Sequence, residues 1–226
     1  MEVTPEQSGV QIALVGAFNP AIFSPHWLIE HGIIQKGDFP DDGLEVVHPE
    51  IAKFHTTNIA IEVQKNRFTA STNAAPFINL HDVVVTLFGE LLPHTPITLV
   101  GINRIVDFKL DSPEKYEKFG EALAPREPWG DWGDKLGKRG GLAVLEMDQR
   151  ELDGRNTGWI KTRVQASPVA ETAVNVLVND HYPLKDNDSY SENGAGAALY
   201  ITKNWDTSIS NAEELINHLM KLSKKV

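Results

Sequence analysis

The chain has 226 residues, of which 41% are hydrophobic and 23% charged, a composition typical of a globular protein rather than a disordered one. Its formal net charge of −10 disfavours non-specific binding to nucleic acid or to anionic membranes, and no apolar run approaches the roughly 20 residues of a membrane-spanning helix. The absence of cysteine excludes disulfides and cysteine nucleophiles, and an acidic, polar start unlike a secretory signal predicts a cytoplasmic location.

The first half of the chain reads as a strand, a short helix, antiparallel strands and a second helix. Residues 10–18 form an apolar run of strand length, and Ser24-Pro25 has the pattern of a helix start. Alternation over residues 59–64 predicts a half-buried strand, and residues 68–72 predict the next one. The apolar spacing of residues 80–92 predicts a well-buried helix that ends before the following proline.

The second half begins with the same plan. Residues 97–110 alternate as a half-exposed strand, and Ser112-Pro113 starts a helix whose apolar stripe ends at Leu123. Three consecutive strands are then expected, at residues 142–147, 159–164 and 173–178.

The end of the chain predicts a loop followed by a helix. Residues 185–196 are rich in Asp, Asn, Ser and Gly, which is typical of an exposed loop, and residues 199–201 predict a short edge strand. Ser210 with Glu213 three residues later has the spacing of a capping box, so the last helix is expected to begin there.

A doubled pattern links the two halves. Leu14-Val15-Gly16 followed by Ser24-Pro25 returns as Leu99-Val100-Gly101 followed by Ser112-Pro113. Two copies of one supersecondary plan would each need the other to bury a shared sheet and helix layer.

The element order predicts an α+β fold. We expect one globular domain over residues 1–226, made of two pseudo-repeats at about 10–95 and 96–226. Their strands would form one largely antiparallel curved sheet with the helices on one side, an element order similar to that of the TATA-binding protein. The similarity concerns the order of elements and does not imply DNA binding.

Motifs for catalysis, metals and cofactors are missing from this sequence. His26 and Glu30 are four residues apart on a helix, but no third ligand follows at a metal-binding spacing. The Asp186 segment lacks the glycine of a calcium loop, and Gly194-Ala195-Gly196 follows no convincing strand and opens no helix, as a dinucleotide turn would require. We therefore predict no metal, no cofactor and no catalytic residue.

The segment from Glu127 to Asp134 is unlike any regular element. It carries Trp129 and Trp132 among Gly, Pro and Asp, which neither helix nor strand patterning explains. One interpretation is a lid folded back over the core, and the other is an aromatic anchor for a partner. Asp131 beside the tryptophans would pair with a basic partner or with Lys135.

Asp180 and His181 end one of the expected strands and enter a loop. An Asp beside a His could orient the imidazole, yet neighbours on a strand point to opposite faces, which favours a turn with a packed Tyr182. The other interpretation is a small-molecule pocket between the sheet and the tryptophan segment that uses His181, Asp180 and Arg104.

Three stretches together resemble an uncharacterised family of conserved bacterial proteins: Gly101-Ile102-Asn103-Arg104 leading to Phe108, then Glu127-Pro128-Trp129-Gly130, then Val178-Asn179-Asp180-His181-Tyr182. The resemblance implies a bacterial cytosolic origin and a single globular unit. It carries no catalytic residue over to this chain.

Three functions remain open on the sequence. The acidic charge and the missing motifs favour a non-catalytic accessory, inhibitor or immunity-type subunit that binds a protein partner, such as a basic one, through the exposed sheet face and the Trp129–Trp132 loop. The alternative is a small-molecule binder or hydrolase with a pocket near His181. Nucleic-acid binding ranks third, because it requires Lys65, Arg67, Lys161 and Arg163 to converge as a basic stripe.

Overall fold

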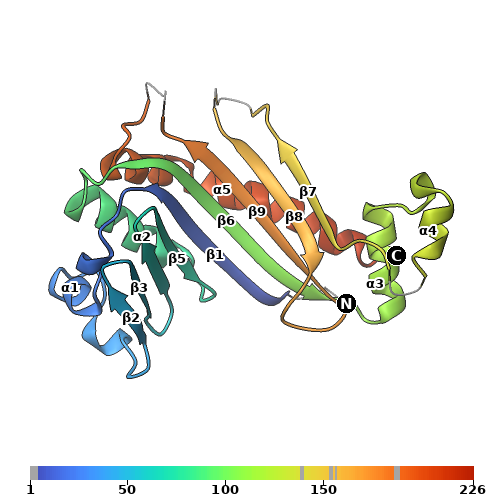
Figure 1. Cartoon of the computed structure of the whole chain (residues 1–226), viewed down its shortest axis with the longest axis horizontal. Helices are drawn as coiled ribbons and strands as arrows, with labels where there is room; N and C mark the ends of the chain where they lie inside the picture. Colours follow the sequence, from blue (N-terminus) through green and yellow to red (C-terminus); the bar gives the residue numbers. More distant parts are fainter. Residues whose placement is uncertain (1–4, 138–139, 153–154, 156, 186–188) are drawn as a thin grey trace.

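The computed structural model describes residues 5–137, 140–152, 155, 157–185 and 189–226 (Figure 1). Its strands are β1 (Pro5–Gly16), β2 (Leu44–His48), β3 (Ile51–His55), β4 (Ala60–Gln64), β5 (Arg67–Thr72), β6 (Ile97–Lys109), β7 (Val144–Gln149), β8 (Trp159–Ala166) and β9 (Ala173–Pro183). Its α-helices are α1 (Pro25–Glu30), α2 (Ile78–Thr86), α3 (Pro113–Leu123), α4 (Asp131–Lys135) and α5 (Gly194–Leu222). Shorter helical turns are η1 (Pro20–Ile22), η2 (Lys36–Asp38), η3 (Leu87–Leu91) and η4 (Glu127–Trp129).

All nine described strands join one antiparallel sheet in the order β2-β3-β4-β5-β1-β6-β9-β8-β7. The prediction of an α+β fold with a largely antiparallel sheet is thereby confirmed. The two longest strands, β1 and β6, pair at its centre, where Ile12 lies opposite Ile102. Both residues point to the same face, since directly paired residues in an antiparallel ladder share a face.

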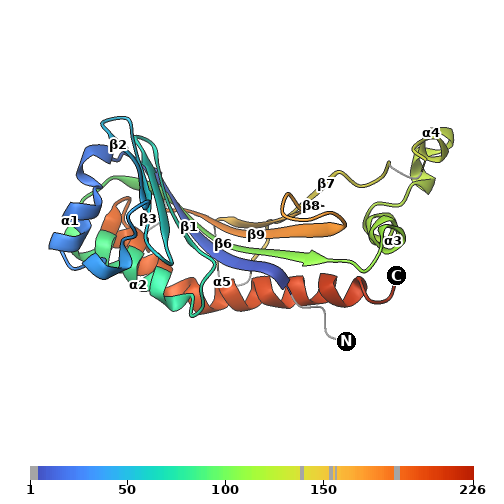
Figure 2. The same ribbon diagram turned by 90° about the horizontal axis from the view of Figure 1, so that it is seen from below.

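The helices α2 and α5 lie on one face of the sheet, and α5 runs along most of its length (Figure 2). Val10, Ile12 and Leu14 of β1 point toward these helices and are buried. The opposite face, which we call the open face, carries no helix over its centre (Figure 2). α3 and α4 lie beyond the end of the sheet, near the C-terminus of α5 (Figure 1).

Four phenylalanines fill the core under the first half of the sheet. Phe68 on β5 packs edge-on against Phe88 with ring centroids 4.9 Å apart, and Phe18 and Phe23 complete the cluster. Aromatic side chains bury large apolar areas and prefer such tilted arrangements. The helix expected over residues 80–92 thus forms as α2 and η3, and its inward side chains close this core.

Three expectations for the end of the chain were wrong. α5 begins at Gly194, where the Asn193 side chain accepts a hydrogen bond from the Gly196 amide (2.9 Å). Gly194-Ala195-Gly196, which was expected to open no helix, therefore forms the first turn of α5, and Ser210 lies inside the helix. Residues 199–201 belong to the same helix and form no edge strand. A Cβ at Gly194 would lie 2.3 Å from the Leu92 carbonyl oxygen, so this glycine permits close packing of α5 on η3.

Within the described ranges, α5 and the other helices are all too short or too polar to cross a bilayer.

Candidate functional site

The tryptophan segment, which we define as residues 127–135 of η4 and α4, projects beyond the end of the sheet (Figure 1). Trp129 is 63% exposed and Trp132 is 56% exposed, and their ring centroids lie 5.4 Å apart. Asp131 lies between them and is also exposed. The tryptophans do not cover the core, so the interpretation of this segment as a lid was wrong.

Arg126 holds the tryptophan segment in a defined conformation. Its guanidinium donates hydrogen bonds to the carbonyl oxygens of Gly137 (2.9 Å) and Gly140 (2.7 Å), which joins the two ends of the segment. Its backbone amide donates to the Glu121 carboxylate (2.7 Å) at the end of α3. Gly133 packs so closely that a Cβ there would lie 2.4 Å from the Arg126 carbonyl oxygen. The aromatic pair is therefore presented on an ordered helical segment, and the expectation that residues 127–134 form no regular element was wrong.

Arg104 has a structural role within the sheet. It is 7% exposed, and its Nη1 donates to the carbonyl oxygens of Gly9 (3.0 Å) and Ile105 (2.9 Å), while Nη2 donates to Ser8 (2.8 Å). Its Nε lies 3.5 Å from the Glu213 carboxylate on α5, and burial lowers its pKa. These contacts tie β1, β6 and α5 together.

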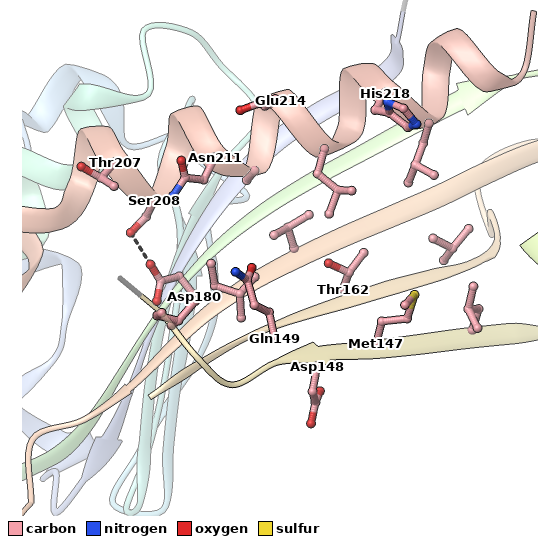
Figure 3. A pocket seen from close by; sticks show the side chains of 18 of the residues that line it. Met147, Asp148, Gln149, Thr162, Asp180, Thr207, Ser208, Asn211, Glu214 and His218 are labelled. Atoms are coloured by element: carbon pink, nitrogen blue, oxygen red, sulfur yellow. Dashed lines mark hydrogen bonds between the residues drawn. The ribbon is translucent and has the colours of Figure 1, made fainter. Parts of the chain in front are cut away.

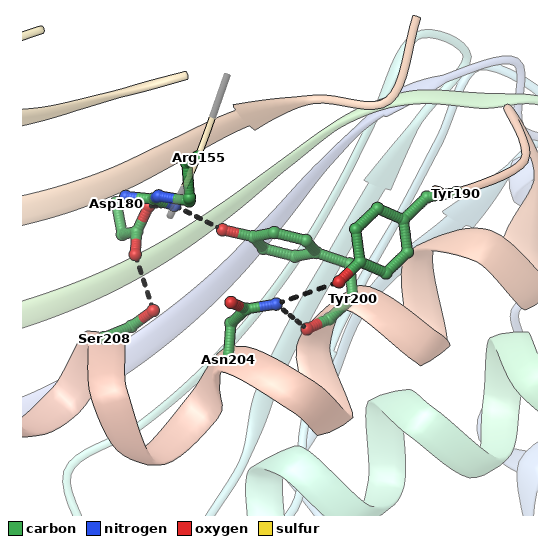
Figure 4. A network of polar contacts seen from close by, with 6 residues as sticks. All are labelled: Arg155, Asp180, Tyr190, Tyr200, Asn204 and Ser208. Carbon is green, nitrogen blue, oxygen red and sulfur yellow. Dashed lines mark hydrogen bonds and ion pairs between the residues drawn. The ribbon is translucent and has the colours of Figure 1, made fainter. Parts of the chain in front are cut away.

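Asp180 lies at the centre of a buried polar network between the sheet and α5 (Figure 4). Its carboxylate accepts hydrogen bonds from Arg155 (2.6 Å) and from the Ser208 hydroxyl (2.6 Å). Arg155 also contacts the Tyr200 hydroxyl at 2.6 Å. Burial opposes the charge of Arg155, but its hydrogen bond and charge interaction with Asp180 outweigh burial and raise its pKa. Burial raises the pKa of Tyr200.

His181 points to the open face, away from Asp180. Its ring stacks on Trp159 at 3.8 Å between centroids, and the Arg150 guanidinium lies 4.9 Å from the same indole ring. Burial lowers the pKa of His181. The expected turn at Asp180 and His181 does not form, because β9 continues to Pro183 and both residues pair with β6 and β8. Because side chains alternate along β9, Asp180 and His181 cannot reach one pocket. The structure therefore does not bring together His181, Asp180 and Arg104 as the small-molecule hypothesis requires.

A groove runs between α5 and the strands β7 and β8 (Figure 3). Its volume is about 1030 Å³, and we call it the α5–β7 groove. Leu145, Ile160 and Val164 of the sheet and Leu215 and Leu219 of α5 give it apolar walls. Its polar end contains Arg155, Asp180 and Ser208, together with Gln149, Asn204, Thr207 and Asn211.

The open face carries a row of polar side chains across its central strands. Paired positions place Ser71, Gln11, Asn103, Asn179 and Lys161 side by side on β5, β1, β6, β9 and β8. The Asn103 amide donates to the Gln11 carbonyl oxygen (3.3 Å) and is 5% exposed. This row gives the face an amide-rich centre with Lys161 at one end.

The basic residues named for nucleic-acid binding are largely paired with carboxylates. Lys65 pairs with Glu50 at 2.5 Å, and Lys161 and Arg163 both contact Glu146. The hydrogen bond from Arg163 lowers the pKa of Glu146. These pairs neutralise the positive charge that phosphate binding would need.

No protein-family model and no curated protein matches the chain. Among the residues that the structure describes, no group of three or more His, Asp or Glu side chains is arranged to hold a metal ion. Sequence reasoning missed Arg155, Tyr200 and Ser208, because their contacts are distant in the chain. Arg155 and Ser208 contact Asp180 over 25 and 28 residues, and Tyr200 contacts Arg155 over 45 residues.

Proposed function

We propose that this chain is a non-catalytic subunit that binds a protein partner through the tryptophan segment and the open sheet face. The observation that carries the proposal is the exposed pair Trp129 and Trp132, held on the helical tryptophan segment that Arg126 orders. Tryptophans are among the residues that contribute most binding energy at interfaces, and a pre-ordered segment lowers the entropy cost of association.

The open face supplies a second surface of a different character. In its polar row, the half-buried side chains of Ser71, Gln11 and Lys161 can hydrogen-bond with a partner, whereas the Asn103 side chain is buried. The net charge of −10 favours a basic partner, because complementary charge speeds association and disfavours acidic competitors. A bacterial, cytoplasmic accessory, inhibitor or immunity-type role is compatible with these features.

The strand order supports a two-unit architecture as part of this proposal. β1 and β6 begin the two units at about residues 10–95 and 96–226, and they lie side by side at the centre of the sheet. β5 flanks β1 and β9 flanks β6, which is the arrangement expected for two similar units in the element order of the TATA-binding protein. The open face would then be composed of both units.

The other two hypotheses have less support. A pocket built on His181 lacks Asp180 and Arg104, which point to the opposite face, and the stack with Trp159 accounts for the position of the imidazole. A nucleic-acid surface lacks unpaired positive charge at Lys65, Lys161 and Arg163.

The proposal is tested by affinity capture from a lysate of the source cells, followed by mass spectrometry and by binding measurements with the purified partner. Ser71→Arg on the open face and the double substitution Trp129→Ala, Trp132→Ala should each weaken binding by at least about 10-fold. Asn217→Arg, which adds the same charge on the exposed side of α5, is the control. Capture of no stoichiometric partner, or unchanged binding by both variants, would contradict the proposal.

A further inference from the structure

The α5–β7 groove has the size and composition of a small-molecule site. Its volume of about 1030 Å³ lies at the upper end of the range for ligand pockets, which runs to about 1,000 Å³. Such pockets combine apolar walls, which supply binding energy, with a few polar groups that orient the ligand. The groove has both, because its apolar walls lead to a polar end around Asp180 and Ser208 (Figure 3). Its lining therefore suits a ligand with an apolar part and a polar part.

The apolar walls of the groove are left incomplete by the helix layer. α5 packs along β6 and β9, whereas β8 and β7 extend past it toward the sheet edge (Figure 2). Leu145 of β7, Ile160 of β8 and Leu215 of α5 line the groove and are only half-buried. An apolar group placed between them would remove their remaining surface from water, and the gain is proportional to the area that it covers.

The charges at the polar end of the groove are already paired within the protein. Asp180 contacts Arg155 at 2.6 Å, and their side chains are only 8% and 15% exposed. Asp148 contacts Arg150 at 2.6 Å, and Figure 3 shows its carboxylate pointing away from α5. A charged ligand would lose its hydration here, and none of these groups would offer it an unpaired opposite charge. This end therefore favours a neutral head group.

The ionisable side chains farther along α5 favour neither sign of charge. Glu214, His218 and Lys221 line this part of the groove, and all three are exposed. One carboxylate and one ammonium group oppose each other there, and water and salt screen exposed charges. These side chains therefore do not select an anion or a cation.

Neutral polar side chains in the groove have hydrogen-bonding capacity to spare. Gln149 of β7, Thr162 of β8 and Asn211 of α5 line it, and none of these three side chains is hydrogen-bonded to another described residue. In Figure 3, Gln149 and Thr162 lie in the space between α5 and the strands. Amides and hydroxyls both donate and accept, so they match the hydroxyl, ester or amide groups of a ligand.

We propose that the α5–β7 groove binds an uncharged amphipathic small molecule. The apolar part of this ligand lies against Leu145, Ile160 and Leu215, and its hydroxyl or ester head contacts Gln149 and Asn211. The inference goes beyond the binding of a protein partner, because the groove is on the helix side of the sheet and apart from the open face. The chain thus has separate sites for a partner and for a ligand.

Isothermal titration calorimetry on the full chain, with three probes of similar chain length, tests the class of ligand. Monooctanoylglycerol is neutral, octanoate is anionic and octyltrimethylammonium is cationic, and all three are kept monomeric. The neutral probe should bind with a dissociation constant of about 0.1–1 mM, as expected for a ligand of its size. Each charged probe should bind at least about 10-fold more weakly, because its lost hydration is not replaced. No binding of the neutral probe, or equal binding of a charged one, would overturn the inference.

A variant that fills the groove tests the location of the site. Asn211→Trp places an indole at the polar end and should weaken the binding of monooctanoylglycerol by at least about 10-fold through steric exclusion. Asn217→Trp is the matched control, because Asn217 is also exposed on α5 but does not line the groove. Circular dichroism verifies that both variants are folded. Equal binding by the two variants would place the probe outside the groove.

A second pair of variants tests the contact with the head group. Gln149→Leu removes the amide but keeps an apolar side chain at the same position, and should weaken the binding of monooctanoylglycerol by about 3–10-fold. Gln64→Leu on β4 is the matched control, since Gln64 is also exposed on a strand and lies outside the groove lining. It should bind the probe as the unmodified chain does. Unchanged binding by Gln149→Leu would contradict the assignment of the polar head to this end of the groove.

Discussion

Asp180 on β9 and Arg155 form an ion pair beneath α5, with Oδ1 and Nη1 2.6 Å apart. Their side chains are only 8% and 15% exposed, so water screens the pair little. Removing one partner leaves the other charge buried without compensation. Asp180→Ala should therefore lower the free energy of unfolding by about 3–5 kcal/mol, measured by urea denaturation.

Asp148 provides the control for this prediction. It also pairs with an arginine at 2.6 Å, but the side chain of that arginine, Arg150, is 64% exposed. Asp148→Ala should cost less than about 1 kcal/mol. Equal effects of the two substitutions would show that the buried network around Asp180 does not stabilise the fold as described.

His181 should make stability depend on pH. Because burial lowers its folded-state pKa below the usual value of 6.5, the unfolded chain takes up the proton at a higher pH than the folded chain. The contribution of His181 is fully present above pH 6.5 and is lost as the pH falls from there toward the folded-state pKa. His181→Phe keeps an aromatic ring against Trp159 but cannot titrate, so it should lose less stability than the unmodified chain between about pH 7 and about pH 5.

His181→Gln separates titration from stacking in the same measurement. It removes the titrating ring and the stack together. Its free energy of unfolding should therefore be lower than that of His181→Phe at every pH. As the pH is lowered, the two variants should lose stability with the same reduced slope. Urea denaturation at each pH gives both quantities. If both variants kept the slope of the unmodified chain, the titration of His181 would not contribute to it.

Gly158 should tolerate alanine much less well than Gly32. Both have left-handed backbone conformations, with φ of +90° and +71°, and this alone costs an alanine about 1–2 kcal/mol. At Gly158 a Cβ would also lie 2.5 Å from the His181 carbonyl oxygen, whereas nothing lies within 4 Å at Gly32. Gly158→Ala should therefore lower the melting temperature more than Gly32→Ala, and equal shifts would contradict the close approach of β8 and β9.

Arg126→Ala should increase the mobility of the tryptophan segment. The substitution removes the hydrogen bonds to Gly137 and Gly140, each expected to be worth about 1.5–3 kcal/mol locally because the donor is charged. Amide hydrogen exchange over residues 127–136 should accelerate by about 10-fold or more, while exchange in β6 and β9 stays unchanged.

Lys115→Ala is the matched control on α3, the helix that ends three residues before Arg126. Lys115 forms an exposed pair with Asp111 at 2.9 Å at the start of α3, far along the chain from the tryptophans. Its removal should leave exchange over residues 127–136 unaltered. Faster exchange in both variants would indicate that α3 as a whole is loosened, rather than the segment that Arg126 orders.

Strands such as β4 could be predicted from the sequence because their burial follows a period of two. The expectation of a half-exposed strand over residues 97–110 was wrong in its burial, because β6 lies at the centre of the sheet and residues 100–104 are all buried. Ile61 and Val63 are buried on β4 while Glu62 between them faces the open side, as the alternation indicated. The same rule placed Asp180 and His181 on opposite faces of β9. Local patterns suffice where one face of a strand meets the core and the other does not.

Features set by distant contacts could not be predicted in this way. Gly194-Ala195-Gly196 has the composition of a loop, yet it opens α5 because small residues are needed where the helix packs on η3. Arg155 lies in a polar stretch without periodicity, and its partners Asp180 and Tyr200 are 25 and 45 residues away. The α5–β7 groove depends on how far the helix layer extends over the sheet, which no local pattern encodes.

The central pairing of β1 with β6 has a consequence for biosynthesis. Partners such as Ser8 and Arg104 are separated by 96 residues, so β1 cannot find its neighbour until β6 has been translated. At about 5–20 residues per second this delay is roughly 5–20 s, during which the apolar side of β1 has only β5 as a neighbouring strand. Such non-local pairing is slow to form. Nascent chains stalled just before β6 should therefore be the species that chaperones bind most strongly.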